Sequence, residues 1–288
     1  MGAAMARRLI ERGLSVTGWD IDPTAVSRVL GDGVAAASSA RAAAAAAEVV
    51  LTSVTEDGGV RELFRGPDGF LSGAVRGKLF IEMSTLQPAT VRDLAPLVQV
   101  AGARLVDAPV LGTIPSARAG ELVALAGGDE GDLERADAVL AHLTKRVFRM
   151  GPLGSGHVMK LAANLGLAAY IQALAEGLAL GIQEGLALEQ MLEVLGGGTV
   201  ATPYLKMKSP VFAGAPAEMT LDIRTLRKDM MSAVATGARN GVPMPLTSGT
   251  LAALTAAVGA GHGTADIAEV PAFFRADAIQ RWDAPDET

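Results

Sequence analysis

Residues 1–9 read MGAAMARRL, a glycine that runs directly into a helix-forming sequence. This pattern resembles the last glycine and first helical turn of the Gly-x-Gly-x-x-Gly fingerprint of dinucleotide-binding α/β domains. In those domains a buried strand and two further glycines come first, and the helix N-terminus receives a diphosphate. We therefore predict that Gly2 lies at a dinucleotide. Neither feature precedes Gly2 in this numbering, so we expect an in-frame apolar strand ending in Gly-x-Gly immediately upstream of Met1.

Short apolar runs alternate with helical patterns from this first helix to about residue 150, an order typical of a parallel sheet with crossover helices. The alanine-rich segment 35–47 is predicted to be one short packed helix, because alanine has the highest helix propensity. The other expected helices include 3–12, 23–30, 88–101 and 132–143. The expected strands are 15–19, 49–54, 79–83, 104–108, 122–126 and 146–150.

The strand pattern stops after Gly151, and the rest of the chain reads as helical with breaks at glycines and prolines. The sequence therefore predicts an α/β fold with two domains. A Rossmann-like dinucleotide-binding domain, lacking its first strand, occupies residues 1–152. An all-α domain follows over residues 153–288 and begins with a long interdomain helix.

The apolar segment 161–182 forms most of that long helix. It contains Asn164, Gln172 and Glu176 among many alanines and glycines, which argues against a membrane span. A helix that is apolar all round is expected to be buried on nearly every face. Small residues recur along it at three- and four-residue spacing and would let a second helix approach closely. We therefore expect this helix to join domains or subunits, in a homodimer or homotetramer.

Composition narrows the class of partner. Half of the 288 residues are apolar, the net charge is −6, and lysines and arginines form no block. This balance argues against nucleic acid and anionic membranes, which both recruit basic patches. The chain has no cysteine, and its three scattered histidines lack the spacing of zinc ligands. We expect a cytoplasmic protein that holds no metal and acts on a small molecule.

Asp20 directly follows the predicted strand 15–19, about 20 residues after the glycine turn. An acidic residue at this position of a dinucleotide-binding domain binds a ribose 2′-hydroxyl and repels a 2′-phosphate. The sequence thus favours NAD over NADP, with NADP still possible. The alternative interpretation is that residues 20–23, Asp-Ile-Asp-Pro, only form a turn and a helix cap.

The segment 151–164, GPLGSGHVMKLAAN, ends a predicted strand and starts the long helix. Lys160 and Asn164 lie four residues apart, on one face of that helix. Burial lowers the pKa of a lysine and prepares it for proton transfer. Lys160 could then protonate a carbonyl oxygen that Asn164 orients. The alternative is a lysine that extends along the helix end into solvent.

Four motifs in this order resemble the β-hydroxyacid dehydrogenases, which include 3-hydroxyisobutyrate dehydrogenases and glyoxylate/succinic semialdehyde reductases, a class related to 6-phosphogluconate dehydrogenases. The resemblance covers essentially the whole chain. Its motifs are the N-terminal glycine at 1–6, the substrate motif DAPVLGT at 107–113, the segment 151–164, and Lys228-Asp229. The resemblance implies reversible hydride transfer between NAD or NADP and a small β-hydroxyacid or its semialdehyde.

The resemblance also implies roles for individual residues. Lys160 would be the general acid in reduction and the general base in oxidation, with Asn164 binding the substrate oxygen. Lys228 would contact the nicotinamide end of the cofactor, although without the resemblance it reads as a surface lysine paired with Asp229. The other implied cofactor-binding residues are Val54, Thr55, Gly59 and Thr85.

One motif departs from the family pattern. The family usually has Ser-Gly-Gly where this chain has Leu111-Gly112-Thr113, so the serine that helps to hold the substrate carboxylate is absent. Gly112 and Thr113 could still bind a carboxylate through backbone N–H groups and a hydroxyl. This segment looks more like the semialdehyde reductase branch. Asp20 does not, because that branch has an Asn-Arg pair there and uses NADP.

Two other functions remain open from the sequence. Imine reductases share the fold and use NADPH, but their catalytic lysine is typically replaced, whereas Lys160 is present. A non-catalytic scaffold with a decayed cofactor site would explain the missing glycines. The missing central strand would leave hydrogen-bonding groups unpaired on its two neighbours, so we favour an upstream start over decay.

Overall fold

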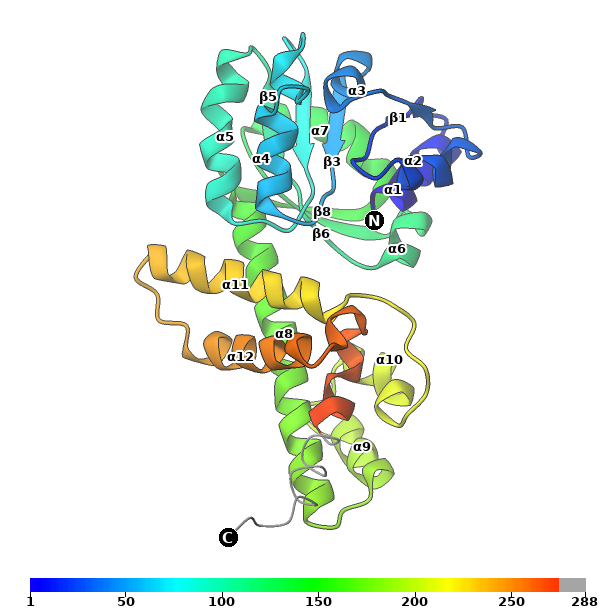
Figure 1. Ribbon diagram of the computed structural model, residues 1–288, viewed down its shortest axis with the longest axis vertical. Helices are drawn as coiled ribbons and strands as arrows, with labels where there is room; N and C mark the ends of the chain where they lie inside the picture. The colour runs from blue at the N-terminus through cyan, green and yellow to red at the C-terminus, as the bar shows by residue number, and fades with distance from the viewer. Residues whose placement is uncertain (275–288) are drawn as a thin grey trace. The chain divides into compact units, whose positions relative to one another are not determined.

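Strands and helices alternate in the N-terminal part of the chain, as the hydrophobic pattern predicts (Figure 1). The computed structural model describes residues 1–274. It divides into two compact units, Met1–Ala162 and Ala163–Thr288. The division lies within a long helix, ten residues beyond the sequence-based boundary at 152.

The first unit contains two sheets. A parallel pair joins β1 (Thr17–Gly18) to β2 (Ala35–Ala36). The larger sheet has the order β3-β4-β5-β7-β6, with β8 paired to β7. Its strands are β3 (Val49–Thr52), β4 (Leu79–Glu82), β5 (Arg104–Asp107), β6 (Val110–Leu111), β7 (Leu122–Gly127) and β8 (Thr144–Gly151).

Strand directions in the larger sheet are mixed. The pairs β3–β4, β4–β5 and β7–β8 are parallel, whereas β7 runs antiparallel to both β5 and β6. The alternating pattern did not predict this reversal. Among the described residues, no strand pairs with both β1 and β3.

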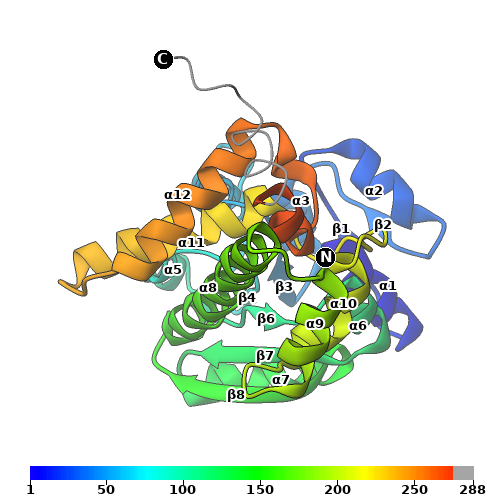
Figure 2. The ribbon, with the colours of Figure 1, turned by 90° about the horizontal axis from the view of Figure 1, so that it is seen from below.

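Helices cover both faces of the larger sheet, and successive strand residues point to opposite sides. On β4, Leu79 and Ile81 join a core with α1 and α7, whereas Phe80 joins a second core with α3, α4 and α5. Figures 1 and 2 show α7 across the sheet from α5. The helices are α1 (Gly2–Glu11), α2 (Pro23–Leu30), α3 (Ala40–Ala46), α4 (Asp57–Arg65), α5 (Pro88–Val100), α6 (Ile114–Ala119) and α7 (Glu130–Leu143).

The prediction of one helix over 35–47 was wrong at its beginning. Ala35 and Ala36 form strand β2, and the helix begins only at Ala40. The Ser39 side chain accepts a hydrogen bond from the Ala42 N–H at 3.1 Å and so caps the first turn. Local capping by a serine therefore sets the start of the helix more strongly than alanine propensity does.

The second unit is helical in its described part, apart from one isolated bridge between Asp222 and Asp266. Helices α11 and α12 pack against each other. The helices are α8 (Ser155–Gln183), which starts in the first unit, α9 (Leu188–Gly197), α10 (Pro203–Phe212), α11 (Ile223–Arg239) and α12 (Pro245–Gly259).

The expectation that α8 is buried on nearly every face was wrong for the chain by itself. By length and composition α8 could cross a membrane, but a core helix of a soluble protein passes the same test. Only 39% of its most apolar 18-residue window is buried. Ile171, Ala175 and Leu178 pack inside the unit, while Leu180 is 67% exposed. The chain therefore leaves one apolar face of α8 open.

Candidate active site

The segments that follow β3 and β4 lie together at one edge of the sheet. These parallel strands end in register at Thr52 and Glu82. Just beyond them, the backbone N–H of Val54 donates to the Ser84 hydroxyl at 2.9 Å. The structure thus joins the segment of Val54 and Thr55 to the one that carries Thr85. Ligands of α/β sheets bind at the carboxyl ends of parallel strands, which is where these residues lie.

Gly2 and Gly59 lie near the same segment. A Cβ placed on Gly2 would be 3.9 Å from the Ser53 Cβ, and one on Gly59 would be 3.8 Å from the Val54 Cγ2. These are ordinary contacts, so packing does not force glycine at either position. Helix α1 has no side-chain cap at its start. Its first N–H groups therefore lie beside the segment that follows β3.

Asp20 follows β1 and is exposed. Its Oδ1 accepts the Asp22 N–H at 2.9 Å, which forms part of the predicted turn. The helix cap is a different residue: Asp22 accepts the Thr24 N–H at 2.9 Å, and hydrogen bonds from the Thr24 side chain and backbone lower the pKa of Asp22. Asp20 therefore takes part in the predicted turn and also presents an exposed carboxylate at the end of the strand.

These features fit a dinucleotide. Uncapped N–H groups at the start of α1 are donors for a diphosphate. The exposed Asp20 carboxylate is an acceptor for a ribose hydroxyl. The role of Gly2 as the third glycine of the fingerprint stays a prediction.

Gly112 and Thr113 connect β6 to α6. Gly112 has φ 130°, and a Cβ there would be 2.8 Å from the Leu122 side chain, so this position requires glycine. Thr113 precedes the first residue of α6, and its hydroxyl lies 3.4 Å from that of Ser116. Two hydroxyls and an exposed glycine backbone are suitable partners for a carboxylate. Their role as substrate-binding residues stays a prediction.

Lys160 and Asn164 are one turn apart on α8, as the spacing predicts. Lys160 is half-buried, and Asn164 is buried with 6% of its surface exposed. The Asn164 Nδ2 donates to the Asp229 Oδ2 at 2.6 Å. Asp229 Oδ1 lies 2.8 Å from the Lys228 ammonium. Asn164 and Lys228 therefore both contact the carboxylate of Asp229.

This arrangement corrects the interpretation of Lys228 as a simple surface lysine. Its partner Asp229 is 1% exposed, and the Lys228 side chain is 22% exposed. The sequence marks Asp229 only as a neighbour of Lys228, because the contact between Asp229 and Asn164 spans 65 residues. The adjacent Lys-Asp pair was the one signal in the sequence.

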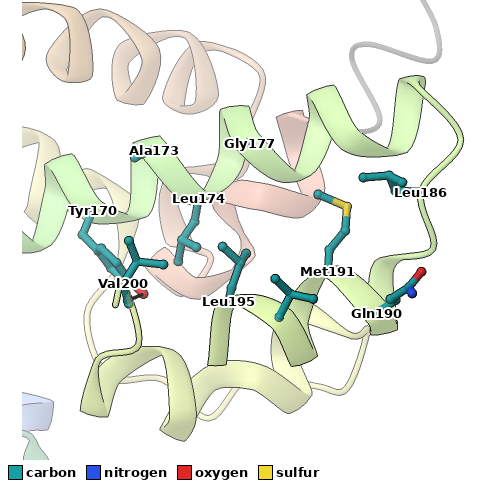
Figure 3. Close-up of a pocket in the computed structure, with 10 residues that line it drawn as sticks. Tyr170, Ala173, Leu174, Gly177, Leu186, Gln190, Met191, Leu195 and Val200 are labelled. Carbon is teal, nitrogen blue, oxygen red and sulfur yellow. Dashed lines mark hydrogen bonds between the residues drawn. The ribbon is translucent and has the colours of Figure 1, made fainter. Parts of the chain in front are cut away.

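A large cavity lies elsewhere in the second unit. It measures about 510 Å³ and is lined mostly by apolar side chains of α8 and α9, including Tyr170, Leu174, Met191 and Leu195 (Figure 3). None of the predicted site residues lines it. The cavity is therefore distinct from the predicted site.

Family models match both parts of the chain. Residues 1–151 match the NAD-binding domain of 6-phosphogluconate dehydrogenase. Residues 154–273 match the NAD-binding region of NADP-dependent 3-hydroxyisobutyrate dehydrogenase.

Individual relatives extend this match. A 3-hydroxyisobutyrate dehydrogenase of Pseudomonas aeruginosa is 31% identical, over 96% of this chain and 95% of the relative. Glyoxylate/succinic semialdehyde reductase 1 of Arabidopsis thaliana is 28% identical, over 94% and 93%. The solved structure of Mycobacterium tuberculosis 3-hydroxyisobutyrate dehydrogenase with L-serine superposes with a TM-score of 0.84, at 30% identity over 96% of each chain. With two family models and relatives matched along nearly its whole length, the chain belongs to the β-hydroxyacid dehydrogenase family.

Proposed function

We propose that this NAD(P)-dependent hydroxyacid dehydrogenase reduces a small carboxylated aldehyde with NADH, and oxidises the corresponding hydroxyacid, such as a β-hydroxyacid, with Lys160 as the proton donor and acceptor. The nicotinamide, when bound, supplies or accepts the hydride. The observation that carries the proposal is the pair of polar residues on α8: half-buried Lys160 lies one turn before Asn164, whose amide is fixed by Asp229.

In this proposal the side chains divide the work. In reduction Lys160 transfers a proton to the carbonyl oxygen as negative charge develops there, and in oxidation it removes the proton from the hydroxyl. Asn164 binds the same oxygen through its side-chain amide. Gly112 and Thr113 hold the carboxylate of the substrate, and Lys228 contacts the cofactor near the nicotinamide.

The choice of cofactor depends on Asp20 in this proposal. Its exposed carboxylate follows β1, where it would accept hydrogen bonds from a ribose and repel a 2′-phosphate. The matched family model is described as NADP-dependent, so the preference needs a direct test. We expect kcat/KM to be higher with NADH than with NADPH, and Asp20→Ser to shift that ratio toward NADPH. Asp22→Ala, which removes only the α2 cap, should leave the ratio unchanged.

The decisive experiment assays the protein with glyoxylate, succinic semialdehyde, methylmalonate semialdehyde and tartronate semialdehyde, each with NADH and with NADPH. Lys160→Ala should lower kcat by at least about 100-fold, the lower end of the range for general acid catalysis. NADH binding, followed by fluorescence, should stay near the wild-type value. A Lys160→Ala protein that retains most of its kcat would contradict the role of Lys160, and a folded wild type that binds no NADH would favour a scaffold.

Self-association is a second part of the proposal. On one face of α8, Gly166, Ala173, Gly177 and Leu180 are all exposed. A Cβ on Gly166 or Gly177 would meet nothing within 4 Å, so a helix of a second copy could approach closely there. The apolar cavity between α8 and α9 adjoins this face, because Ala173 and Gly177 also line it (Figure 3). We propose a homodimer or larger homo-oligomer. We also propose a cytoplasmic location.

A further inference from the structure

Asp107, the last residue of β5, is fully buried and accepts three hydrogen bonds from the start of α8. Its Oδ1 accepts the Gly154 N–H at 2.6 Å. Its Oδ2 accepts the His157 N–H at 2.8 Å and contacts the His157 ring Nδ1 at 2.9 Å. A helix begins with N–H groups that have no partner within the helix. Here a strand residue 47 positions earlier in the sequence provides the acceptors.

The start of α8 has almost no freedom to move at this contact. A Cβ on Gly156 would lie 2.0 Å from the carbonyl oxygen of Leu125 and 2.8 Å from the Asp107 Oδ2. A Cβ on Gly127 would lie 2.5 Å from the Asp107 Oδ1. Two glycines thus let the helix start lie directly on β7 around the buried carboxylate. Close packing of this kind transmits small displacements instead of absorbing them.

His157 completes the contact and is also fully buried. Because the Asp107 carboxylate can only accept, the ring Nδ1 is the donor, which fixes the tautomer. In the part of the chain that the structure describes, the ring Nε2 has no hydrogen-bond partner. The His157 ring therefore contacts Asp107 through Nδ1 alone.

A second buried acid, Glu82, lies beside Asp107 on the neighbouring strand. Glu82 pairs with Asp107 across β4 and β5 and is fully buried. Burial raises the pKa of Glu82, which favours its neutral form. The three contacts from the start of α8 all go to Asp107, so Asp107 is the acid of this pair that joins the helix start to the sheet.

We propose that Asp107 and His157 are positioning residues that fix the first turn of α8 on the sheet and thereby hold the ammonium of Lys160 in place for proton transfer. Lys160 follows His157 by three residues, less than one helical turn. The inference rests on the proposed role of Lys160. It gives Asp107, which belongs to the substrate motif by resemblance, a role in placing the proton donor.

Substitutions at His157 test this role. His157→Leu removes the Nδ1 donor, whereas His157→Asn keeps an N–H donor near the same point. We expect His157→Leu to lower kcat by about 10- to 100-fold, since a misplacement of about 1 Å has effects of that size. The KM for NADH should be unchanged, and His157→Asn should restore most of the loss. Amide hydrogen exchange over residues 154–164 should be faster in His157→Leu than in the wild type.

His142→Leu is the control, because His142 belongs to the same unit and lies on α7, and it should leave kcat and exchange unchanged. If His157→Leu fails to fold, His157→Gln replaces it. The glutamine amide extends past the Nδ1 position and therefore does not replace the donor that Asp107 loses. An active wild type with unchanged kcat in His157→Leu would overturn the positioning role and leave Lys160 as proton donor intact. A wild type inactive on every aldehyde would defeat the proposed function. The positioning role of Asp107 and His157 is then judged by amide hydrogen exchange alone, and unchanged exchange in His157→Leu would overturn it.

Discussion

Single residues in this protein act through partners far away in the sequence, and Asp229 is the clearest example. Its buried carboxylate accepts from Asn164 on α8 and pairs with Lys228 on α11. In Asp229→Asn the charge is lost while the size is kept. We expect the free energy of unfolding to fall by about 1–3 kcal/mol, the cost of leaving a buried group poorly satisfied. We also expect kcat to fall, because the Asn164 amide loses its orientation.

Denaturant unfolding and steady-state kinetics check both effects of Asp229→Asn. Asp93→Asn is the control, because Asp93 pairs with Arg61 at the surface with 59% of its side chain exposed. That pair should contribute less than about 1 kcal/mol. Equal losses of stability in the two variants would refute the special position of Asp229.

Glu82 makes a prediction about pH. Burial raises its pKa above the ordinary 4.5, although hydrogen bonds from Ser84 and Thr52 oppose this. The folded protein therefore holds the Glu82 proton more tightly than the unfolded chain. The stability that this proton contributes is complete below the unfolded pKa and is lost as the pH rises through the folded pKa. Glu82→Gln removes the ionisation, so its stability relative to the wild type should increase with pH.

Urea unfolding of the wild type and Glu82→Gln at several pH values between about 4 and 8 measures this difference. Glu11→Gln, an exposed glutamate on α1, should show no comparable trend. A constant difference across the whole range would mean that Glu82 keeps an ordinary pKa.

At the scale of elements, sequence patterns predict long buried segments well and short ones poorly. Strands β3, β4 and β5 begin at the predicted residues because each is a distinct apolar run. Helix α2 is mostly exposed and has the predicted bounds because Asp22 caps its first turn and Pro23 starts it. Strands β2 and β6 have only two residues each and were missed, since no periodicity exists over two positions.

The candidate site shows the same division. The placement of Lys160 and Asn164 on one face of a helix could be predicted because one helix carries both at a fixed spacing, while their roles stay predictions. The Asp107–His157 contact was missed because it spans 50 residues and depends on how a helix start packs on a sheet. A contact between residues that are distant in the sequence produces no regular residue spacing from which it could be predicted.

The glycines at the start of α8 allow a test of element packing. Gly156→Ala would place a Cβ 2.0 Å from the Leu125 carbonyl oxygen, so the first turn must move off β7. We expect the free energy of unfolding to fall by about 1–3 kcal/mol, as for other overpacked sites. Gly131→Ala on α7 is the matched control, because nothing lies within 4 Å of its Cβ. It should instead stabilise the protein by about 0.4–1 kcal/mol, since alanine reduces the entropy of the unfolded chain. Opposite signs in denaturant unfolding are the expected outcome, and two stabilising substitutions would contradict the close packing.

At the scale of the whole molecule, the open face of α8 is the main feature that one chain leaves unexplained. Gly177 and Leu180 lie on this face, and Val194 on the neighbouring helix α9 is 68% exposed. Exposed apolar surface of this extent marks interaction sites more often than plain solvent contact. A stable interface between two copies buries about 1,200–2,000 Å² in total, and close helix packing needs small residues at the contact.

Gly177→Arg tests the association directly. A Cβ at Gly177 meets nothing within 4 Å, so the arginine fits the isolated chain but obstructs an approaching helix. By light scattering after size exclusion, the wild type should have a multiple of the 29.4 kDa chain mass, and Gly177→Arg should have the mass of one chain. Gly131→Arg on α7 adds the same charge at another open glycine and should keep the wild-type mass. A loss of mass could come from a lost interface or from a misfolded chain. Because the substitution leaves the packing within each unit intact, thermal unfolding distinguishes the two. A Gly177→Arg protein that unfolds cooperatively as a monomer places the interface on α8, whereas one that keeps the wild-type mass moves it elsewhere.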